Sequence, residues 1–167
     1  AVNRMTRMIR QVTTVSNRMH VALGRIDSTK LLEGAIARFR GEQKFPITFD
    51  VHNEANDAIV MANPELFEDA IEKLLLNAWE SYGSHPAGEI VITIESRVTN
   101  RDGRPIVEYS VSDRGNGLDA KVRDHVFEPF VSTKSTVGVG MGLTIARHGI
   151  RNLGGEILLT DRPGGGT

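Results

Sequence analysis

Apolar side chains recur at intervals of three and four along several stretches of the chain, which is the spacing of one buried helix face. In the first stretch the stripe consists of methionine, isoleucine and valine, and the arginines lie largely off it. We predict helices at residues 3–22, 28–40, 63–82 and 141–153. Ser28 is expected to cap the second helix and Gly41 to end it. Asn63 is expected to cap the third helix, because a proline follows it in the first turn.

In other stretches apolar and polar residues alternate, which is typical of strands with one buried face. We predict strands at residues 47–52, 58–61, 89–98, 105–112 and 156–160. The sequence Asn100-Arg101-Asp102-Gly103 lies between the third and fourth of these and has the composition of a hairpin turn. This mixture of strands and helices predicts an α/β domain.

The composition excludes several classes of function. A chain of 167 residues with 40% hydrophobic and 25% charged residues is typical of one soluble domain with an appendage. The net charge of -1 provides no overall attraction to nucleic acid or to an anionic membrane, so any phosphate binding must be local. With no cysteines, the chain has neither disulfides nor thiolate metal sites. Because it begins at Ala1 and stops just after a glycine cluster, we expect it to be part of a longer protein.

Asp113 is the strongest single candidate for a binding residue. It continues the inward face that Val107 and Val111 share, so its carboxylate is expected to point inward at the end of a strand. A carboxylate in that position is costly unless it is hydrogen-bonded or used, and an ionised one can accept from the N6 amino group of adenine. Gly115 and Gly117 suit positive φ angles and close approach to a flat base. The alternative is an ordinary aspartate that begins a turn.

Asn77 lies within a predicted apolar helix, where asparagine is unfavourable without a specific reason. An amide oxygen is a hard, neutral ligand suited to Mg²⁺, which otherwise keeps waters and phosphate oxygens. The alternative is a surface or internally bonded asparagine. Lys73 lies one turn earlier on the same face, where it can touch a phosphate or remain a solvated lysine.

Gly138, Gly140 and Gly142 precede the last predicted helix, and Leu143 follows them. Small residues let backbone N–H groups approach phosphates, and a helix N-terminus adds a favourable potential. The spacing is neither that of a dinucleotide-binding Rossmann motif nor that of a P-loop. A merely flexible loop is the alternative. The polar residues 132–140 are expected to form a lid over the ligand, with Phe127 among the residues that anchor its hinge.

Taken in order, these motifs resemble the catalytic ATP-binding domain of bacterial sensor histidine kinases, in the superfamily of gyrase, heat-shock chaperone, histidine kinase and mismatch-repair ATPases. The resemblance covers residues 43–167 and implies a Bergerat-type α/β two-layer sandwich, with a mixed sheet and helices on one face. It implies that Asn77 binds Mg²⁺, that Asp113 contacts adenine and that Lys134 contacts a phosphate. Thr167, in a final glycine box, would help to bind adenine. The expected nucleotide-binding residues are Asn77, Asp113, Gly115, Gly117, Lys134, Gly138, Gly140, Gly142, Leu143 and Thr167.

The same resemblance implies transfer of the γ-phosphate of Mg-ATP to a histidine outside this chain. None of the histidines here has the context of a phosphoacceptor; they are His20, His52, His85, His125 and His148. Residues 1–42 would be the end of a helical dimerisation and phosphotransfer region with its linker. The implied partners are that helical domain, a response regulator receiver domain and a second copy of the full-length protein, without nucleic acid, in the cytoplasm. One more strand would follow Thr167 in the family, so we expect the sheet to lack it here.

Three alternatives share the fold: an ATPase clamp of the gyrase or mismatch-repair type, a degenerate domain used only for protein interaction, and a serine kinase. Lys73 stands where relatives often carry asparagine, or glutamate in the hydrolytic branch, and it cannot be the carboxylate base that activates water. That departure argues against the clamp. Intact Asp113, Asn77 and Gly142 argue against the degenerate domain.

Overall fold

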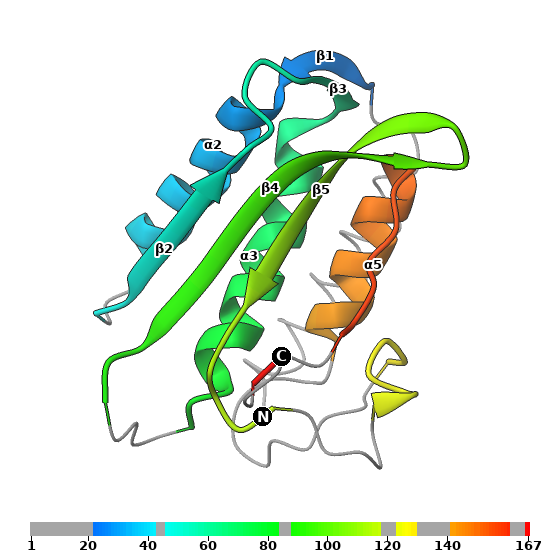
Figure 1. Ribbon diagram of the computed structural model, residues 1–167. Helices are drawn as coiled ribbons and strands as arrows, with labels where there is room; N and C mark the ends of the chain where they lie inside the picture. The colour runs from blue at the N-terminus through cyan, green and yellow to red at the C-terminus, as the bar shows by residue number, and fades with distance from the viewer. Residues whose placement is uncertain (1–21, 43–45, 84–87, 118–122, 130–140, 161–165) are drawn as a thin grey trace.

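A computed structural model describes residues 22–42, 46–83, 88–117, 123–129, 141–160 and 166–167. Within them, three helices lie side by side on one face of a three-stranded sheet (Figure 1). In chain order the elements are β1 (Gly24–Asp27), α2 (Ser28–Glu42), β2 (Thr48–Asn53), β3 (Ile59–Ala62), α3 (Pro64–Glu80), β4 (Val91–Arg101), β5 (Arg104–Ser112) and α5 (Gly142–Asn152). The predicted helix at residues 3–22 lies outside the described residues, apart from its last position.

The sheet is mixed, as the resemblance implied. Its order is β2-β4-β5, with β2 parallel to β4 and β4 antiparallel to β5. A separate antiparallel pair joins β1 to β3, with Gly24 opposite Ala62. The two-layer α/β sandwich predicted from the sequence is therefore confirmed.

The core lies between the helices and the inner face of the sheet. Its buried members are apolar residues of α2, α3 and β4, together with the last residue of β3 and the residue just before β4. They are Leu31, Leu32, Ala35, Ile36, Phe39, Ala62, Phe67, Ile71, Leu75, Ala78, Ile90, Ile92 and Ile94. These positions recur with helical spacing in α2 and α3 and with period two in β4, so one face of each element supplies them. Although α2 precedes residue 43, it packs into this same core, and a domain division at that point stays a prediction.

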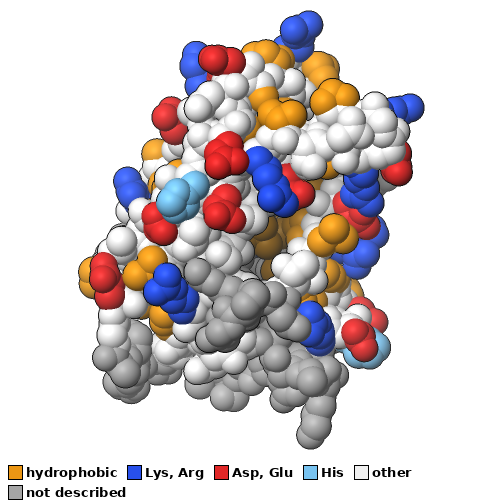
Figure 2. Space-filling model, in the orientation of Figure 1, with side chains coloured by type: hydrophobic (Ala, Val, Ile, Leu, Met, Phe, Trp, Pro, Cys, Tyr) orange, Lys and Arg blue, Asp and Glu red, His pale blue; other side chains and the backbone are white. Residues whose placement is uncertain are grey.

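The opposite face of the sheet is polar. Figure 2 shows charged side chains on this face. Arg97 of β4 pairs with Glu108 of β5 at 2.6 Å, and His52 of β2 lies 3.0 Å from Asp50. Because the described helices all cover the other face, alternation along each strand separates an apolar side from a charged one.

The start of α3 agrees with the sequence prediction. Asn63 has an extended backbone, and its side-chain oxygen accepts a hydrogen bond of 3.1 Å from the Leu66 backbone N–H. Pro64 occupies the first turn, where a missing N–H costs nothing.

The predicted cap of α2 is wrong by one residue. Asp27 rather than Ser28 caps the helix, since its Oδ1 accepts from the backbone N–H groups of Thr29 at 2.8 Å and Lys30 at 3.2 Å. Ser28 is buried, and its hydroxyl donates instead to the Ala55 carbonyl at 2.7 Å. Both residue types are good caps, and only the tertiary contact to Ala55 decides between them. The helix also runs one residue past Gly41.

The hairpin is tighter than predicted, and the last predicted strand is absent. Asp102 and Gly103 alone form the turn, with φ angles of 53° and 77°, so β4 and β5 extend to either side of them. Residues 156–160, in contrast, form no strand. Alternation predicts one buried face, but a strand also needs a neighbouring backbone, which this segment does not pair with. Its contact with the hairpin is an ion pair of 2.8 Å between Glu156 and Arg101.

None of the helices in the described part of the chain combines the length and the apolar character that a membrane crossing requires.

Candidate nucleotide-binding site

The end of α3, the turn after β5 and the beginning of α5 lie at the same end of the molecule (Figure 1). Hydrogen bonds of Ser81 join the first two of these segments. The Asn116 backbone N–H donates to the Ser81 carbonyl at 3.0 Å, and the Ser81 hydroxyl donates to Asp113 Oδ1 at 2.8 Å. The structure thus brings together Asp113 and the helix that carries Asn77, which are distant in sequence.

Asp113 is 2% exposed, as its place on the inward face of β5 predicted. Its Oδ1 accepts from the Ser81 hydroxyl and from the Gly115 backbone N–H, each at 2.8 Å. Its own backbone N–H donates to the Thr167 carbonyl at 2.9 Å. These two hydrogen bonds fix the orientation of the Asp113 side chain.

Glycines around Asp113 allow backbone segments to touch. A Cβ on Gly115 would lie 2.6 Å from the Ser81 carbonyl carbon, which real Cβ atoms do not approach. Gly117 has the predicted positive φ, at 68°, whereas the positive φ predicted for Gly115 is wrong. Gly166 has a φ of 89°. A Cβ on Gly166 would lie 2.8 Å from the Asp113 carbonyl carbon, so the segment before Thr167 packs directly on the strand end. The predicted contact of Thr167 with adenine stays a prediction.

Ser81 and Tyr82 support the site and were not predicted from the sequence. The Tyr82 hydroxyl donates to the Val91 carbonyl at 2.6 Å and accepts from the Arg114 backbone N–H at 3.1 Å. Ser81 follows Asn77 by one helical turn, which is the one sequence signal that could have indicated it. Both residues orient the Asp113 turn from the end of α3.

Helix α5 packs closely along one stripe of α3. A Cβ on Gly149 would meet the Leu66 carbonyl oxygen at 3.5 Å and the Ala70 Cβ at 3.8 Å, which is ordinary contact. The two helices run in opposite directions in Figure 1. Leu66 and Ala70, spaced by four, therefore mark the face of α3 that α5 covers.

Continuing that stripe by one and two further turns reaches Lys73 and Asn77. In α5, Gly142 lies about two turns before Gly149, which is about 10 Å along the axis. Because the helices are antiparallel, the first turn of α5 lies level with Lys73 and Asn77. The stripe of α3 that faces α5 is therefore apolar beside Gly149, and it carries Lys73 and Asn77 toward the beginning of α5.

Among the described residues, Gly142 has room for a side chain. A Cβ at this position would meet nothing within 4 Å, so packing within the described residues does not require a glycine there. A glycine that is unnecessary for packing fits close approach by a ligand to the helix N-terminus. Leu143 is the next residue of α5, whereas Lys134, Gly138 and Gly140 lie outside the described residues.

The segment before the predicted lid is attached to α5. The Thr144 hydroxyl donates to the Phe127 carbonyl at 2.9 Å, and the Arg147 guanidinium lies 4.8 Å from the centre of the Phe127 ring. These contacts agree with Phe127 as an anchor of the hinge. The lid itself, residues 132–140, lies outside the described part of the chain.

The residues present fit a nucleotide-bound Mg²⁺ rather than a protein-only metal site. In the described residues no three histidine or acidic side chains are grouped as metal ligands. Mg²⁺ that is already coordinated by nucleotide phosphates needs only one or two protein ligands, and the amide of Asn77 has a suitable oxygen. Asn77 is half-buried, level with the start of α5.

The described histidines have local roles. His52 lies beside Asp50, and His125 Nδ1 lies 2.8 Å from Glu128 Oε1. The hydrogen bond and the charge of Glu128 raise the pKa of His125. His148 lies on α5, while His20 and His85 are outside the described residues.

Comparison with known proteins agrees with this geometry. Residues 62–167 match a family described as histidine kinase-, DNA gyrase B-, and HSP90-like ATPase. The chain is 25% identical to the sensor histidine kinase ZraS of Escherichia coli, over 99% of this chain and 34% of that protein. It is 30% identical to the C4-dicarboxylate transport sensor protein DctB of Rhizobium meliloti, over 89% of this chain and 23% of that protein. The chain thus spans about a third or less of these relatives.

A solved structure shows the same fold. The catalytic domain of the histidine kinase ThkA, in a nucleotide-free form, superposes with a TM-score of 0.70 at 26% identity. The match covers 87% of this chain and 93% of that one. The chain therefore belongs to the histidine kinase-, DNA gyrase B- and HSP90-like ATPase family, as an ATP-binding catalytic domain of the sensor histidine kinase type.

Proposed function

We propose that this domain binds Mg-ATP and presents the γ-phosphate to a histidine outside these residues. The observation that carries the proposal is the convergence of three groups at one end of the fold. A buried carboxylate, Asp113, is hydrogen-bonded to Ser81 at the end of α3, the helix that carries Asn77. Helix α5, which starts at Gly142, begins at the same end of the molecule (Figure 1). The sensor histidine kinases that this chain resembles support phosphotransfer rather than ATP hydrolysis alone.

Each group has a distinct task in this proposal. Asp113 accepts a hydrogen bond from the adenine amino group, while the open backbone at Gly142 donates to phosphate oxygens. Asn77 holds the metal, which would neutralise phosphate charge when bound. Lys134, with Gly138 and Gly140, would complete the phosphate contacts. Phosphoryl transfer depends mainly on positioning and charge neutralisation, which these groups would supply. The acceptor histidine outside these residues would supply the attacking nitrogen, and ADP would leave.

The partners follow from the same proposal. The chain before β1 would end a helical dimerisation and phosphotransfer region that carries the acceptor histidine, since β1 and α2 pack with the ATP-binding fold. A receiver domain of a response regulator would take the phosphate next, and the full-length protein would be a homodimer in the cytoplasm or on the cytoplasmic side of a membrane. The related sensor kinases support this arrangement.

The chain of residues 1–167 is expected to bind ATP without labelling itself from γ-labelled ATP. A protein extended upstream to include the acceptor helix should label itself on histidine. The phosphate should be labile in acid and stable in base, which identifies phosphohistidine. Robust self-labelling of residues 1–167, or phosphoserine alone in the extended protein, would contradict the proposal.

Asn77→Ala is expected to weaken ATP binding by at least about tenfold in the presence of Mg²⁺, because a metal ligand is lost. The loss in the presence of EDTA should be much smaller. Asn100→Ala is the matched control, since Asn100 is exposed near the hairpin tip. Calorimetry with and without Mg²⁺ measures both effects. An equal loss under both conditions would show that Asn77 is structural or binds the nucleotide directly.

A further inference from the structure

We propose that Lys73 is a phosphate-binding residue of this site, and that it selects nucleotides with a polyphosphate chain over those without one. A bound nucleoside triphosphate would draw the Lys73 ammonium group from Glu72 onto phosphate oxygens. This inference rests on the proposed function, because it assumes that a nucleotide occupies the end of α3.

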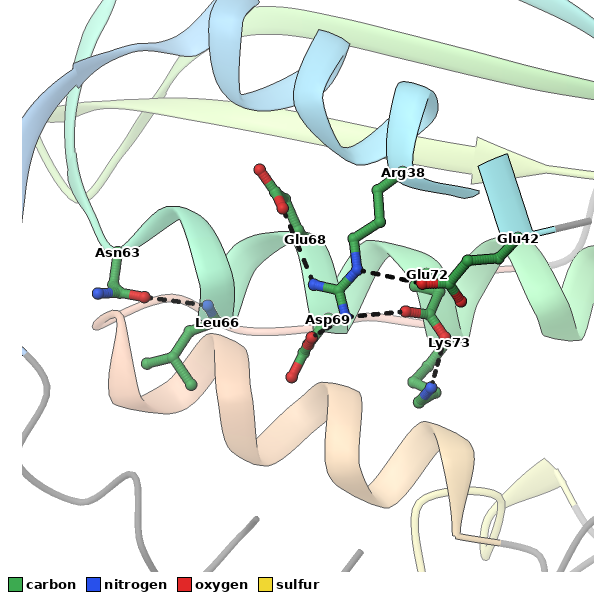
Figure 3. Close-up of polar contacts among 8 residues, drawn as sticks. All are labelled: Arg38, Glu42, Asn63, Leu66, Glu68, Asp69, Glu72 and Lys73. Carbon is green, nitrogen blue, oxygen red and sulfur yellow. Dashed lines mark hydrogen bonds and ion pairs between the residues drawn. The ribbon is translucent and has the colours of Figure 1, made fainter. Parts of the chain in front are cut away.

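The first support is the position of Lys73. It lies on the stripe of α3 that Leu66 and Ala70 define as the contact face for α5. Beside Gly149 this stripe is apolar, whereas Lys73 lies about one turn beyond Ala70, in the direction of the first turn of α5. In Figure 3 the Lys73 side chain extends away from α2, on the side of α3 where α5 lies. The ammonium group is therefore on the side where the phosphates of the proposed ligand would lie.

The second support is the charge arrangement behind Lys73. Arg38 of α2 reaches three carboxylates of α3, at 2.7 Å from Asp69, 3.4 Å from Glu72 and 3.8 Å from Glu68 (Figure 3). Burial lowers the pKa of Arg38, but the carboxylates, Asp69 first, outweigh it and raise that pKa above its ordinary value. Arg38 is thus a fixed positive charge on the side of these three α3 carboxylates that faces α2.

Glu72 has two cationic partners as a result. Its Oε2 lies 3.4 Å from Arg38, and its Oε1 accepts from Lys73 Nζ at 2.7 Å. The Glu72 side chain is 13% exposed, so losing all its partners would leave a poorly solvated charge. Because Arg38 stays in place, Lys73 can move to a ligand without leaving Glu72 unpaired.

The pair between Glu72 and Lys73 is also a weak competitor for a phosphate. Residues 72 and 73 are neighbours in the helix, which is not one of the favourable spacings of three or four for an ion pair. A triphosphate carries several negative charges, and a flexible lysine is suited to such a charge because it needs no fixed geometry. Phosphate oxygens should therefore displace Glu72.

The test compares ligands with and without phosphates on four variants of the chain. ATP binding is measured by calorimetry and adenosine binding by NMR titration, both without Mg²⁺ so that Asn77 has no metal to hold. Lys73→Met should weaken ATP binding by about tenfold or more, since a charge-assisted hydrogen bond is lost. Its adenosine affinity should stay within about twofold of the unchanged chain, because adenosine lacks the groups that Lys73 would contact.

Three controls separate charge, pairing and binding. Lys73→Arg should retain most of the ATP affinity, because the charge remains. Lys30→Met removes the same charge from an exposed position near the start of α2 and should leave ATP affinity unchanged. Glu72→Gln frees Lys73 and should leave ATP affinity unchanged or increase it.

The outcomes distinguish this inference from the proposed function. If the unchanged chain binds no ATP, both fail. If it binds ATP and Lys73→Met binds equally well, the role of Lys73 alone is wrong. Equal losses of ATP and adenosine in Lys73→Met would show a structural role, and a loss of ATP affinity in Glu72→Gln would show that the ion pair itself matters. Either result would overturn the inference.

Discussion

Asp113→Asn is expected to weaken ATP binding by about ten- to a hundredfold while the domain remains folded. Asparagine retains an Oδ1 that can still accept from Ser81 and Gly115, which are the contacts that hold the turn. The second carboxylate oxygen becomes an amide nitrogen, which donates rather than accepts. A donor facing the adenine amino group leaves both groups unpaired in a buried position, which costs about 1–3 kcal/mol.

Calorimetry with ATP and GTP, together with a thermal melt, measures this effect. ATP should bind the unchanged chain more tightly than GTP, because guanine has a carbonyl where adenine has its amino group. Asp102→Asn is the matched control: it removes the same charge from the exposed hairpin turn, where asparagine tolerates a φ of 53°. Equal affinities for ATP and GTP in the unchanged chain, or full ATP affinity in Asp113→Asn, would refute the adenine assignment.

Gly115→Ala is expected to lower both stability and nucleotide binding. The new methyl group would lie 2.6 Å from the carbonyl carbon of Ser81 and 2.7 Å from the Cβ of Ser81. The carbonyl carbon belongs to the backbone at the end of α3, so the neighbour cannot simply rotate away. Relieving the overlap must move Ser81 or Asp113, and overpacking of this kind costs about 1–3 kcal/mol. We expect a melting temperature lower by roughly 5 °C.

Gly41→Ala is the control for that change. Nothing lies within 4 Å of a Cβ at Gly41, and alanine there should be neutral or slightly stabilising because the residue is helical. Differential scanning calorimetry gives the two melting temperatures, and an ATP titration of each variant gives the affinities. If Gly115→Ala has the same melting temperature and ATP affinity as the unchanged chain, close packing of Ser81 against Gly115 does not require a glycine there.

Local signals were sufficient for the elements that border the site. Asn63 followed by Pro64 predicted the start of α3, because a cap and a first-turn proline act within a few residues of each other. Asp102 and Gly103 predicted the hairpin, since few residues accept the positive φ angles of that turn. The inward position of Asp113 followed from the alternation of β5.

Local signals failed where a distant contact decides the outcome. Ser28 and Asp27 are both good helix caps. Because the Ser28 hydroxyl is hydrogen-bonded to the Ala55 carbonyl, Asp27 caps the helix instead. Residues 156–160 alternate like a strand, yet alternation cannot reveal whether a partner backbone is present. Ser81 and Tyr82 carry no motif, and their contacts with Asp113 and Arg114 span 32 residues of sequence.

The sequence by itself determined which chemical groups this domain has and the faces on which they lie. It placed Lys73 and Asn77 on one stripe of α3 and Asp113 on the inner face of β5, because periodicity is a local property of the backbone. The tertiary structure alone decided that α5 runs antiparallel to α3, so that Gly142 lies level with that stripe, and that Thr167 pairs with the backbone of Asp113. The pairing of Thr167 depends on close packing at Gly166, where a side chain would collide with the backbone of Asp113, a neighbour that the sequence does not identify.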